Sequence, residues 1–287
     1  MTEHTGSNAE PVCSSHPDRV TYIKCTRCNN PICPECMIPA SVGFQCPSCV
    51  GNTKVPKVVT PVGGAVVDKP YVTYALIAIN IVVFALQFSI GIDESSTQYG
   101  MWPAGIAMNG SYWTLISAAF MHASPLHIVF NMYILYVMGI TLERIFGHTR
   151  FVVLYLLAAL GGSVASYWFS DLRTVSVGAS GAVFGLMGAF VVAGRRLKFD
   201  ITQVLILLGI NLAFGFIGQG IDWRAHLGGM AVGAIVAAIF VFAPKRHRTL
   251  IQTIGCLAVL AVLIAAVMVR TADIQNLLAP FVPGIAT

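Results

Sequence analysis

The chain has 287 residues, of which 56% are hydrophobic and only 10% are charged. Soluble domains carry about a quarter charged residues, so this composition excludes an ordinary soluble protein and indicates a multi-span membrane protein. The net charge is +5, but the positions of the basic residues, given below, are explained by membrane topology, and no nucleic-acid partner is expected.

The first 50 residues hold seven of the eight cysteines. A spacing of two residues between ligands lets a tight turn direct both side chains at one ion, and four such pairs suffice for two tetrahedral zinc sites. A disulfide or redox cluster is the alternative, which a reducing cytoplasm disfavours. We therefore expect residues 1–50 to form a domain stabilised by two structural zinc ions. The pairs are Cys13 and His16, Cys25 and Cys28, Cys33 and Cys36, and Cys46 and Cys49.

This pattern resembles B-box-type and related cross-brace zinc fingers. The spacing alone also allows sequential pairing, and B-box families usually end in histidines where this chain has cysteines. Such modules mostly bind proteins, which implies a cytoplasmic protein partner. Because the pairs alternate in cross-brace folds, the resemblance implies one ion on Cys13, His16, Cys33 and Cys36 and the other on Cys25, Cys28, Cys46 and Cys49.

A linker rich in Gly, Pro and Val is expected at 51–70, and seven apolar segments follow it. Most of them approach the ~20 residues that a bilayer-spanning helix needs, although the fourth is short and polar residues interrupt the fifth. The connection 91–125 is too polar and irregular to be another span, and its aromatic residues suit the membrane interface. The fold class is therefore an all-α multi-pass membrane protein. The segments cover 71–90, 126–146, 149–169, 178–194, 201–219, 225–243 and 250–269.

Lysine and arginine are distributed unequally between the two sides that these segments define. Of the 17 basic residues, all but Arg173, Arg224 and Arg270 fall on the side of the N-terminus. The positive-inside rule then places the N-terminus in the cytoplasm and the C-terminus outside. A bacterial-type plasma membrane is the expected location.

Polar side chains inside membrane spans are costly and therefore indicate function. His127 and Asn131, four residues apart in the second segment, share one helix face. Ser180 follows Gly178 near the outer end of the fourth segment, and His226 begins the sixth at the same depth. Helix packing explains each feature alone, since small and polar residues allow close helix contacts. Their arrival at one membrane level from separate spans instead predicts a site.

These residue types supply the parts of a serine hydrolase. The imidazole of His226 can act as a base for Ser180. The face that carries His127 and Asn131, together with a backbone N–H, can donate hydrogen bonds to an oxyanion. Because no carboxylate lies within a span, we expect a dyad in which packing orients His226, with no cofactor in the chemistry.

Over about residues 71–243 the chain resembles rhomboid intramembrane serine proteases. The resemblance implies a protease core of six transmembrane helices around a water-filled cavity. The seventh helix and the tail, at 244–287, are an addition that some members of the family carry. It implies Ser180 as nucleophile and His226 as general base. The oxyanion hole would comprise His127, Asn131 and the backbone N–H of Ser180. The matching positions are Trp113, His122, His127, Asn131, Gly178, Ser180, Gly181, Ala225, His226, Gly229 and Gly233.

The resemblance also assigns supporting roles. His122 would brace the long first loop, and Gly178 belongs to the motif around the serine. Many bacterial rhomboids have a tyrosine four residues after the serine, stacked on the catalytic imidazole. Phe184 stands there in this chain, which keeps the stacking face and loses only the hydroxyl. Glu143 matches a further family motif and is expected to be structural.

The favoured function is thus a serine endopeptidase that cleaves single-span membrane proteins, within the lipid bilayer, near their extracytoplasmic end. The alternative is a non-catalytic adaptor that binds membrane proteins through its core and zinc finger, as inactive relatives do. The presence of both Ser180 and His226 favours the protease. A transporter would need charged residues or broken helices near the midplane, and only the fifth segment offers this. The sequence specifies neither the substrate nor the oligomeric state.

Overall fold

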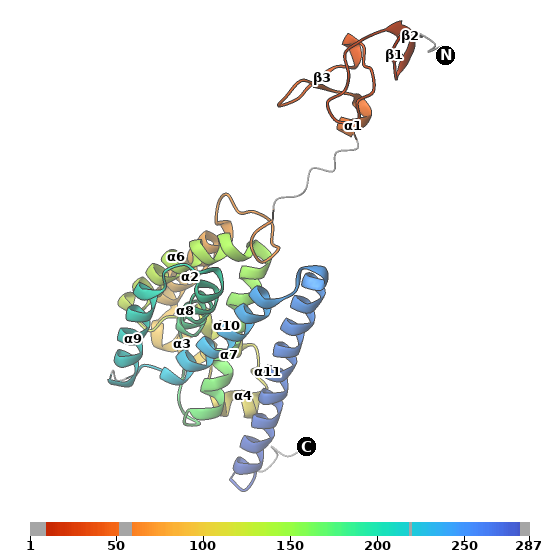
Figure 1. Ribbon diagram of the computed structural model, residues 1–287. Helices are drawn as coiled ribbons and strands as arrows, with labels where there is room; N and C mark the ends of the chain where they lie inside the picture. The colour runs from red at the N-terminus through yellow and green to blue at the C-terminus, as the bar shows by residue number, and fades with distance from the viewer. Residues whose placement is uncertain (1–9, 52–58, 218–219, 282–287) are drawn as a thin grey trace. The chain divides into compact units, whose positions relative to one another are not determined.

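The computed structural model describes residues 10–51, 59–217 and 220–281 (Figure 1). The chain divides into two compact units, Met1–Lys57 and Val58–Thr287. The first unit contains the cysteine pairs, and the second contains the long apolar helices.

Short strands and turns build the first unit. Each of its two hairpins is a pair of antiparallel strands, with Cys13 opposite His16 in one and Ile38 opposite Gln45 in the other. The buried apolar cluster of its described part consists of Ile32 and five cysteines, so there is almost no conventional hydrophobic core. The elements are β1 (Val12–Cys13), β2 (His16–Val20), η1 (Pro34–Cys36), β3 (Ile38–Pro39), β4 (Phe44–Gln45) and α1 (Pro47–Gly51).

Seven apolar helices dominate the described part of the second unit. Six of them are long and apolar enough to cross a membrane, and α9 is shorter. Their order and bounds confirm the predicted all-α multi-pass fold, and the chain is an integral membrane protein. The helices are α2 (Tyr71–Ile90), α6 (Pro125–Phe146), α7 (His148–Phe169), α8 (Ser180–Leu197), α9 (Thr202–Ile217), α10 (Trp223–Phe242) and α11 (Arg248–Leu278).

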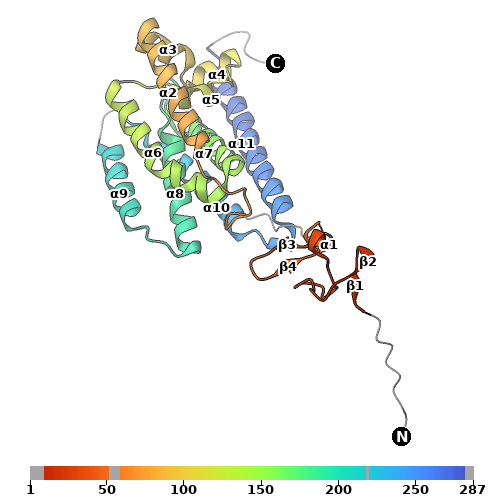
Figure 2. The same cartoon turned by 90° about the horizontal axis from the view of Figure 1, so that it is seen from above.

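The centre of this unit is α8, packed against α7 and α10. Of its membrane-spanning window 67% is buried inside the protein, against 17% for α2 at the periphery. Figures 1 and 2 show α9 and α11 on opposite sides of this centre. Small residues make the close packing possible, because a Cβ at Gly233 of α10 would collide with the backbone of Gly185 in α8.

Local sequence signals set the helix ends. The hydroxyl of Ser124 caps α6 by accepting a hydrogen bond from the backbone N–H of His127 (3.2 Å), and Pro125 follows at the first helical position. Glu143, fully buried near the end of α6, accepts hydrogen bonds from the backbone N–H groups of Val72 (3.0 Å) and Thr73 (2.8 Å). Its carboxylate thus holds the N-terminus of α2, in the structural role expected of it.

The long connection between α2 and α6 contains no spanning helix in its described residues, as predicted. It folds into α3 (Ile92–Tyr99), α4 (Pro103–Asn109), α5 (Thr114–Ser117) and η2 (Ala118–Phe120). Two backbone contacts tie it to the segment before α8. Met101 pairs with Ser176, and Ala118 accepts a hydrogen bond from the N–H of Gly178 (2.9 Å). The connection therefore helps to position the segment that leads into Ser180.

The predicted linker and the seventh helix both differ from what the sequence led us to expect. Of the predicted linker 51–70, residues 52–58 lie outside the described residues, but Val62 and Val67 are buried in the second unit. The seventh helix, expected at 250–269, extends to Leu278. Its added turns are held by Ile274, which is fully buried, and by Gln275, which donates a hydrogen bond to the carbonyl of Ala107 (2.9 Å).

Candidate active site and metal centres

Ser180 is the first residue of α8, and Gly178 shapes the turn that leads into it. Gly178 has φ +135°, a conformation that L side chains rarely adopt. A Cβ at this position would lie 2.7 Å from Cε1 and 2.8 Å from Nε2 of His127, and 3.4 Å from the hydroxyl oxygen of Ser180. The imidazole of His127 and the hydroxyl of Ser180 therefore border the same small space, which only glycine leaves open.

His226 reaches the same region from α10. Its ring stacks on Phe184, with ring centroids 4.1 Å apart and an interplanar angle of 8°. Phe184 lies four residues after Ser180, so the two share one face of α8. The stack thus fixes the imidazole of His226 within one helical turn of Ser180, at a position where only 7% of the histidine is exposed.

The backbones of three helices meet directly behind this pair. A Cβ at Gly181 would lie 3.3 Å from Cα of Gly162 in α7 and 3.5 Å from the carbonyl oxygen of Ala225 in α10. A Cβ at Gly229 would overlap the carbonyl oxygen of Gly181. These approaches hold the residues next to Ser180 and His226 in van der Waals contact across the helices.

His127 and Asn131 lie together on α6. The backbone N–H of Ala123 donates to Nδ1 of His127 (3.4 Å). In a neutral imidazole this arrangement leaves the proton on Nε2, the nitrogen that borders Gly178 and Ser180. Asn131 is buried, and its amide nitrogen donates to the carbonyl of His127 (3.1 Å). The His127 ring thus presents an N–H donor toward the serine.

His122 lies between α2 and α6. Its backbone N–H donates to the side-chain oxygen of Gln87 (2.8 Å), and its fully buried ring packs edge-on against the rings of Phe84 and His127. It joins the end of the long connection to α2 and supports His127 by packing. The sequence-predicted site residues are therefore brought to one end of the helical core.

Asp222, which lies between the fifth and sixth predicted apolar segments, is the N-cap of α10. Its carboxylate accepts hydrogen bonds from the backbone N–H of Ala225 (3.2 Å), the hydroxyl of Ser176 (2.6 Å) and the hydroxyl of Ser166. One carboxylate therefore joins α7, the segment before α8, and the start of the helix that carries His226. An Asp three residues before the start of an apolar segment is a typical helix N-cap signal, and the sequence already contained it.

The ring of His226 also faces α9. A Cβ at Gly215 would lie 3.5 Å from Nδ1 of His226, so this end of α9 covers the histidine. Among the described residues Nδ1 is buried and has no hydrogen-bond partner. Packing against Phe184 and α9 is thus what orients the ring in the described structure.

In the first unit the cysteine pairs gather into two clusters with metal-ligand geometry. The ligand atoms within each cluster lie within 4.8 Å of one another, and the pairs alternate between the clusters instead of following sequentially. One cluster comprises Cys13, His16, Cys33 and Cys36, and the other comprises Cys25, Cys28, Cys46 and Cys49.

The interatomic distances fit a tetrahedral ion. Zinc–ligand bonds of about 2.3 Å to sulfur and 2.0–2.1 Å to nitrogen place two sulfurs about 3.8 Å apart, and a sulfur and a nitrogen about 3.6 Å apart. The sulfurs of Cys28 and Cys46 are 3.8 Å apart. Nδ1 of His16 lies 3.9 Å from the sulfur of Cys13, 3.4 Å from that of Cys33 and 3.3 Å from that of Cys36.

Crowding of the thiols affects their acidity. Hydrogen bonds with the thiols of Cys46 and Cys28 raise the pKa of Cys49 to about 12. Burial, followed by a hydrogen bond with Cys33, raises the pKa of Cys36 to about 11. Such thiols keep their protons unless a cation compensates the charge, so metal binding by these clusters releases protons.

Comparison with known proteins gives the family. Residues 109–243 match the Rhomboid domain. Rhomboid protease GluP of Bacillus subtilis (strain 168) is 35% identical over 188 residues, which cover 62% of this chain and 36% of GluP. Rhomboid protease AarA of Providencia stuartii is 27% identical over 210 residues, covering 61% of this chain and 74% of AarA.

A third relative is matched over most of its length. The rhomboid-type protein YdcA of Bacillus subtilis is 32% identical over 149 residues, covering 50% of this chain and 73% of YdcA. The matched Rhomboid domain contains Ser180, His226, His127 and Asn131, the residues gathered at the end of the core. The chain belongs to the rhomboid family.

Proposed function

We propose that the protein is an intramembrane serine protease in which Ser180 is the nucleophile and His226 the general base. The observation that carries this proposal is the stack of His226 on Phe184, one turn from Ser180, with the N–H donor of His127 bordering the same hydroxyl. A serine, an imidazole base and an oxyanion donor are the minimum set for acyl transfer by a dyad.

In the proposed reaction His226 removes the hydroxyl proton of Ser180 as the serine oxygen attacks the scissile carbonyl carbon. The backbone N–H of Ser180, Nε2–H of His127 and the amide of Asn131 donate hydrogen bonds to the resulting oxyanion. His226 then gives the proton to the leaving amine as the C–N bond breaks. Water, deprotonated by His226, hydrolyses the acyl-enzyme ester and regenerates Ser180.

One structural feature supports the proposed chemistry, and another supports entry of a substrate from the membrane. Ser180 begins α8, where the partial positive charge of the helix N-terminus favours the oxyanion. The neighbouring α9 is the shortest of the apolar helices described, and it borders His226 through Gly215, so its displacement would admit a substrate laterally. The proposed substrates are single-span membrane proteins, cleaved near the extracytoplasmic end of the span.

The distribution of basic residues supports the orientation. With 14 of the 17 lysines and arginines on the side of the N-terminus, we place that terminus in the cytoplasm of a cell with a bacterial-type plasma membrane. The C-terminus, Ser180 and His226 then lie toward the outer side.

We propose that the two clusters of the first unit each bind a structural zinc ion. Their Cys₃His and Cys₄ ligand sets, with four ligands each, match structural zinc sites. The module is proposed to bind a cytoplasmic protein and to take no part in peptide cleavage.

The test is cleavage of a single-span reporter by the purified protein in liposomes. Wild type is expected to cut the reporter, whereas Ser180→Ala and His226→Ala lose on the order of 10³-fold or more of the rate. Ser89→Ala removes an exposed hydroxyl from α2 and serves as the matched control, with an unchanged rate. Cleavage that persists in Ser180→Ala contradicts the proposal. Folded wild type that cuts none of several reporters supports the adaptor function instead.

A further inference from the structure

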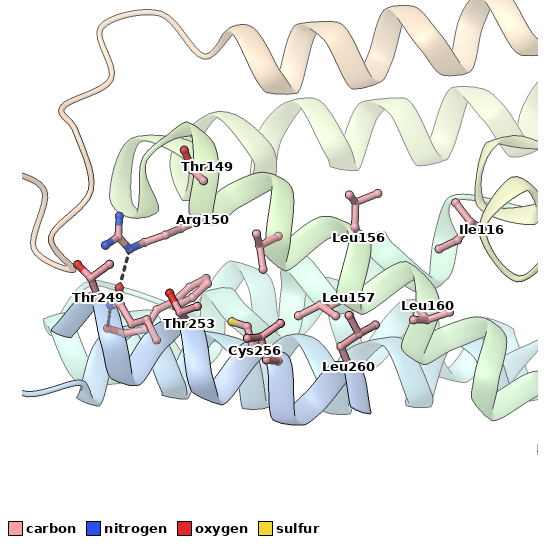
Figure 3. Close-up of a pocket in the computed structure, with 14 residues that line it drawn as sticks. Ile116, Thr149, Arg150, Leu156, Leu157, Leu160, Thr249, Thr253, Cys256 and Leu260 are labelled. Atoms are coloured by element: carbon pink, nitrogen blue, oxygen red, sulfur yellow. Dashed lines mark hydrogen bonds between the residues drawn. The ribbon is translucent and has the colours of Figure 1, made fainter. Parts of the chain in front are cut away.

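A groove with a volume of about 510 Å³ lies between α7 and α11, apart from the candidate active site. Figure 3 shows its apolar walls, which are formed by Leu156, Leu157 and Leu160 of α7 and by Leu260 of α11, with Ile116 of α5 at one end. Leu257 lines it too and is 59% exposed, so the groove opens toward the surrounding membrane. Its volume is within the range of about 300–1,000 Å³ typical of small-molecule sites.

The opposite end of the groove is polar and basic. Figure 3 shows Arg150 there, near the start of α7, together with the hydroxyls of Thr249 and Thr253 on the first turns of α11. Lys245 and Arg246, in the turn just before α11, add further positive charge to this end of the helix pair. This end therefore lies at the boundary between the membrane and water.

Arg150 is held in place by a buried partner. Its Nε donates to the side-chain oxygen of Gln252 (2.8 Å), which is only 4% exposed. The amide nitrogen of Gln252 donates in turn to the carbonyls of Val62 (3.1 Å) and Phe240 (2.9 Å). This network fixes the guanidinium through a single N–H, and the terminal nitrogens project from it at the polar end of the groove (Figure 3).

The charge of Arg150 has no counter-ion within the described structure. Across residues 10–51, 59–217 and 220–281, no carboxylate lies within ion-pair distance of its guanidinium. At the boundary between the membrane and water, the planar fork of an arginine is suited to bidentate contact with a phosphate, and anionic lipid headgroups lie at this level. The groove therefore offers a cationic end and an apolar channel to one amphipathic molecule.

The length of the groove indicates which class of amphipathic molecule it would bind. The ten residues from Arg150 to Leu160 rise about 15 Å along α7, half of the ~30 Å hydrocarbon core. An acyl chain of one leaflet has this reach, with its phosphate at the membrane boundary. A free phosphate would leave the apolar walls unused.

We propose that this groove binds one anionic glycerophospholipid, with its phosphate on Arg150 and the threonine hydroxyls and one acyl chain between α7 and α11. The lipid comes from the leaflet at which both helices begin, the cytoplasmic leaflet in the orientation proposed above. The bound lipid fills the space between the rhomboid core and the added seventh helix.

The test is photo-crosslinking of the full-length protein in phosphatidylcholine nanodiscs that contain a small fraction of phosphatidylglycerol with a diazirine in its acyl chain. Peptide mass spectrometry then locates the crosslinks. They are expected to concentrate on 156–160 and 257–260. A probe with a phosphatidylcholine headgroup should give at least fivefold less crosslinking at these positions.

Two pairs of variants make the test specific. Arg150→Gln is expected to reduce the groove crosslinks by roughly fivefold, the effect of one basic residue at a membrane surface. Arg195→Gln, which removes an exposed charge from the end of α8, should not reduce them. Leu257→Trp should block the channel, whereas Ile254→Trp, at an equally exposed position of α11 outside the groove, should not.

Either of two results overturns the proposal. One is crosslinking spread evenly over the lipid-facing helices, and the other is groove crosslinking that both Arg150→Gln and Leu257→Trp leave unchanged. Size-exclusion profiles show whether each variant is folded. Leu257→Trp keeps the hydrogen bond between Arg150 and Gln252, so it tests the groove even if Arg150→Gln disturbs folding.

Discussion

At the scale of single residues, the ring of Phe184 stacks on His226 and, together with α9, orients it. We predict that Phe184→Ala lowers kcat by roughly 10- to 100-fold, because a small displacement of a catalytic group is enough for a loss of this size. Phe184→Tyr should retain most of the activity, since it preserves the stacking face.

The loss in Phe184→Ala must be separated from unfolding. Truncating a buried phenylalanine costs about 3–5 kcal/mol of stability, so rates are to be compared per folded molecule at a temperature well below the Tm. Full activity in folded Phe184→Ala would show that the stack does not position the base.

Asp222 is predicted to act on His226 through the helix that it caps. Asp222→Ala removes the cap of α10 and the hydrogen-bond acceptor of Ser166 and Ser176, so both the Tm and kcat should fall. Loss of an N-cap alone costs about 0.5–2 kcal/mol. Asp222→Asn, which can still cap the helix, should retain most of the Tm and of kcat. If Asp222→Asn lowers the Tm and kcat as much as Asp222→Ala does, the negative charge of the carboxylate is responsible for the effect, and the helix cap is not.

The sequence allowed part of the candidate site to be proposed because serine and histidine are conspicuous within apolar spans. Ser180 and His226 could be proposed from that contrast and from their common depth. The partners of Asp222 could not, since Ser166 and Ser176 are 56 and 46 residues distant in the chain and meet it only in the folded protein. The tautomer of His127 likewise depends on a backbone contact that no motif contains.

At the scale of helices, the glycines between α8 and α10 set how closely the site residues approach. We predict that Gly229→Ala strongly destabilises the protein, because the added methyl group would overlap the backbone of Gly181, which cannot move aside alone. Thermal unfolding and cleavage of the single-span reporter measure the effect.

The matched control is Gly209→Ala on α9. A Cβ there would meet no atom within 4 Å, and alanine favours helix over glycine by about 1 kcal/mol, so the Tm should stay constant or rise. A Tm that falls equally in both variants would contradict the packing argument.

Helix positions followed from hydropathy, since about 20 apolar residues in a bilayer leave few alternatives to a helix. Hydropathy could not predict the extension of α11 to Leu278, which depends on the contact of Gln275 with Ala107 beyond the apolar stretch. Nor could composition predict that Val62 and Val67 would be buried, because a Gly- and Pro-rich segment resembles a linker until its packing surface is known.

At the scale of the whole molecule, the two units are predicted to differ in what stabilises them. A chelator should remove two zinc ions and unfold the first unit, while the helical unit stays folded. The reason is that the buried cluster in the described part of the first unit consists only of Ile32 and cysteines. Elemental analysis, limited proteolysis and circular dichroism measure these changes.

Single cysteine variants sharpen this prediction. Cys46→Ser should lower the zinc content from two ions to one, since it breaks one of the two clusters. Cys256→Ser, outside both clusters on α11, should retain two. A zinc content that is lowered equally by both substitutions, or by neither, would contradict the assignment of ligands.

The most direct test of the central claim is labelling of the purified protein with a fluorophosphonate, which reacts only with an activated serine, followed by mapping of the modified peptide. We predict a single adduct on Ser180 in wild type, its loss in His226→Ala, and undiminished labelling in Ser89→Ala. Labelling of a different serine, or labelling of Ser180 that persists without His226, would contradict the dyad.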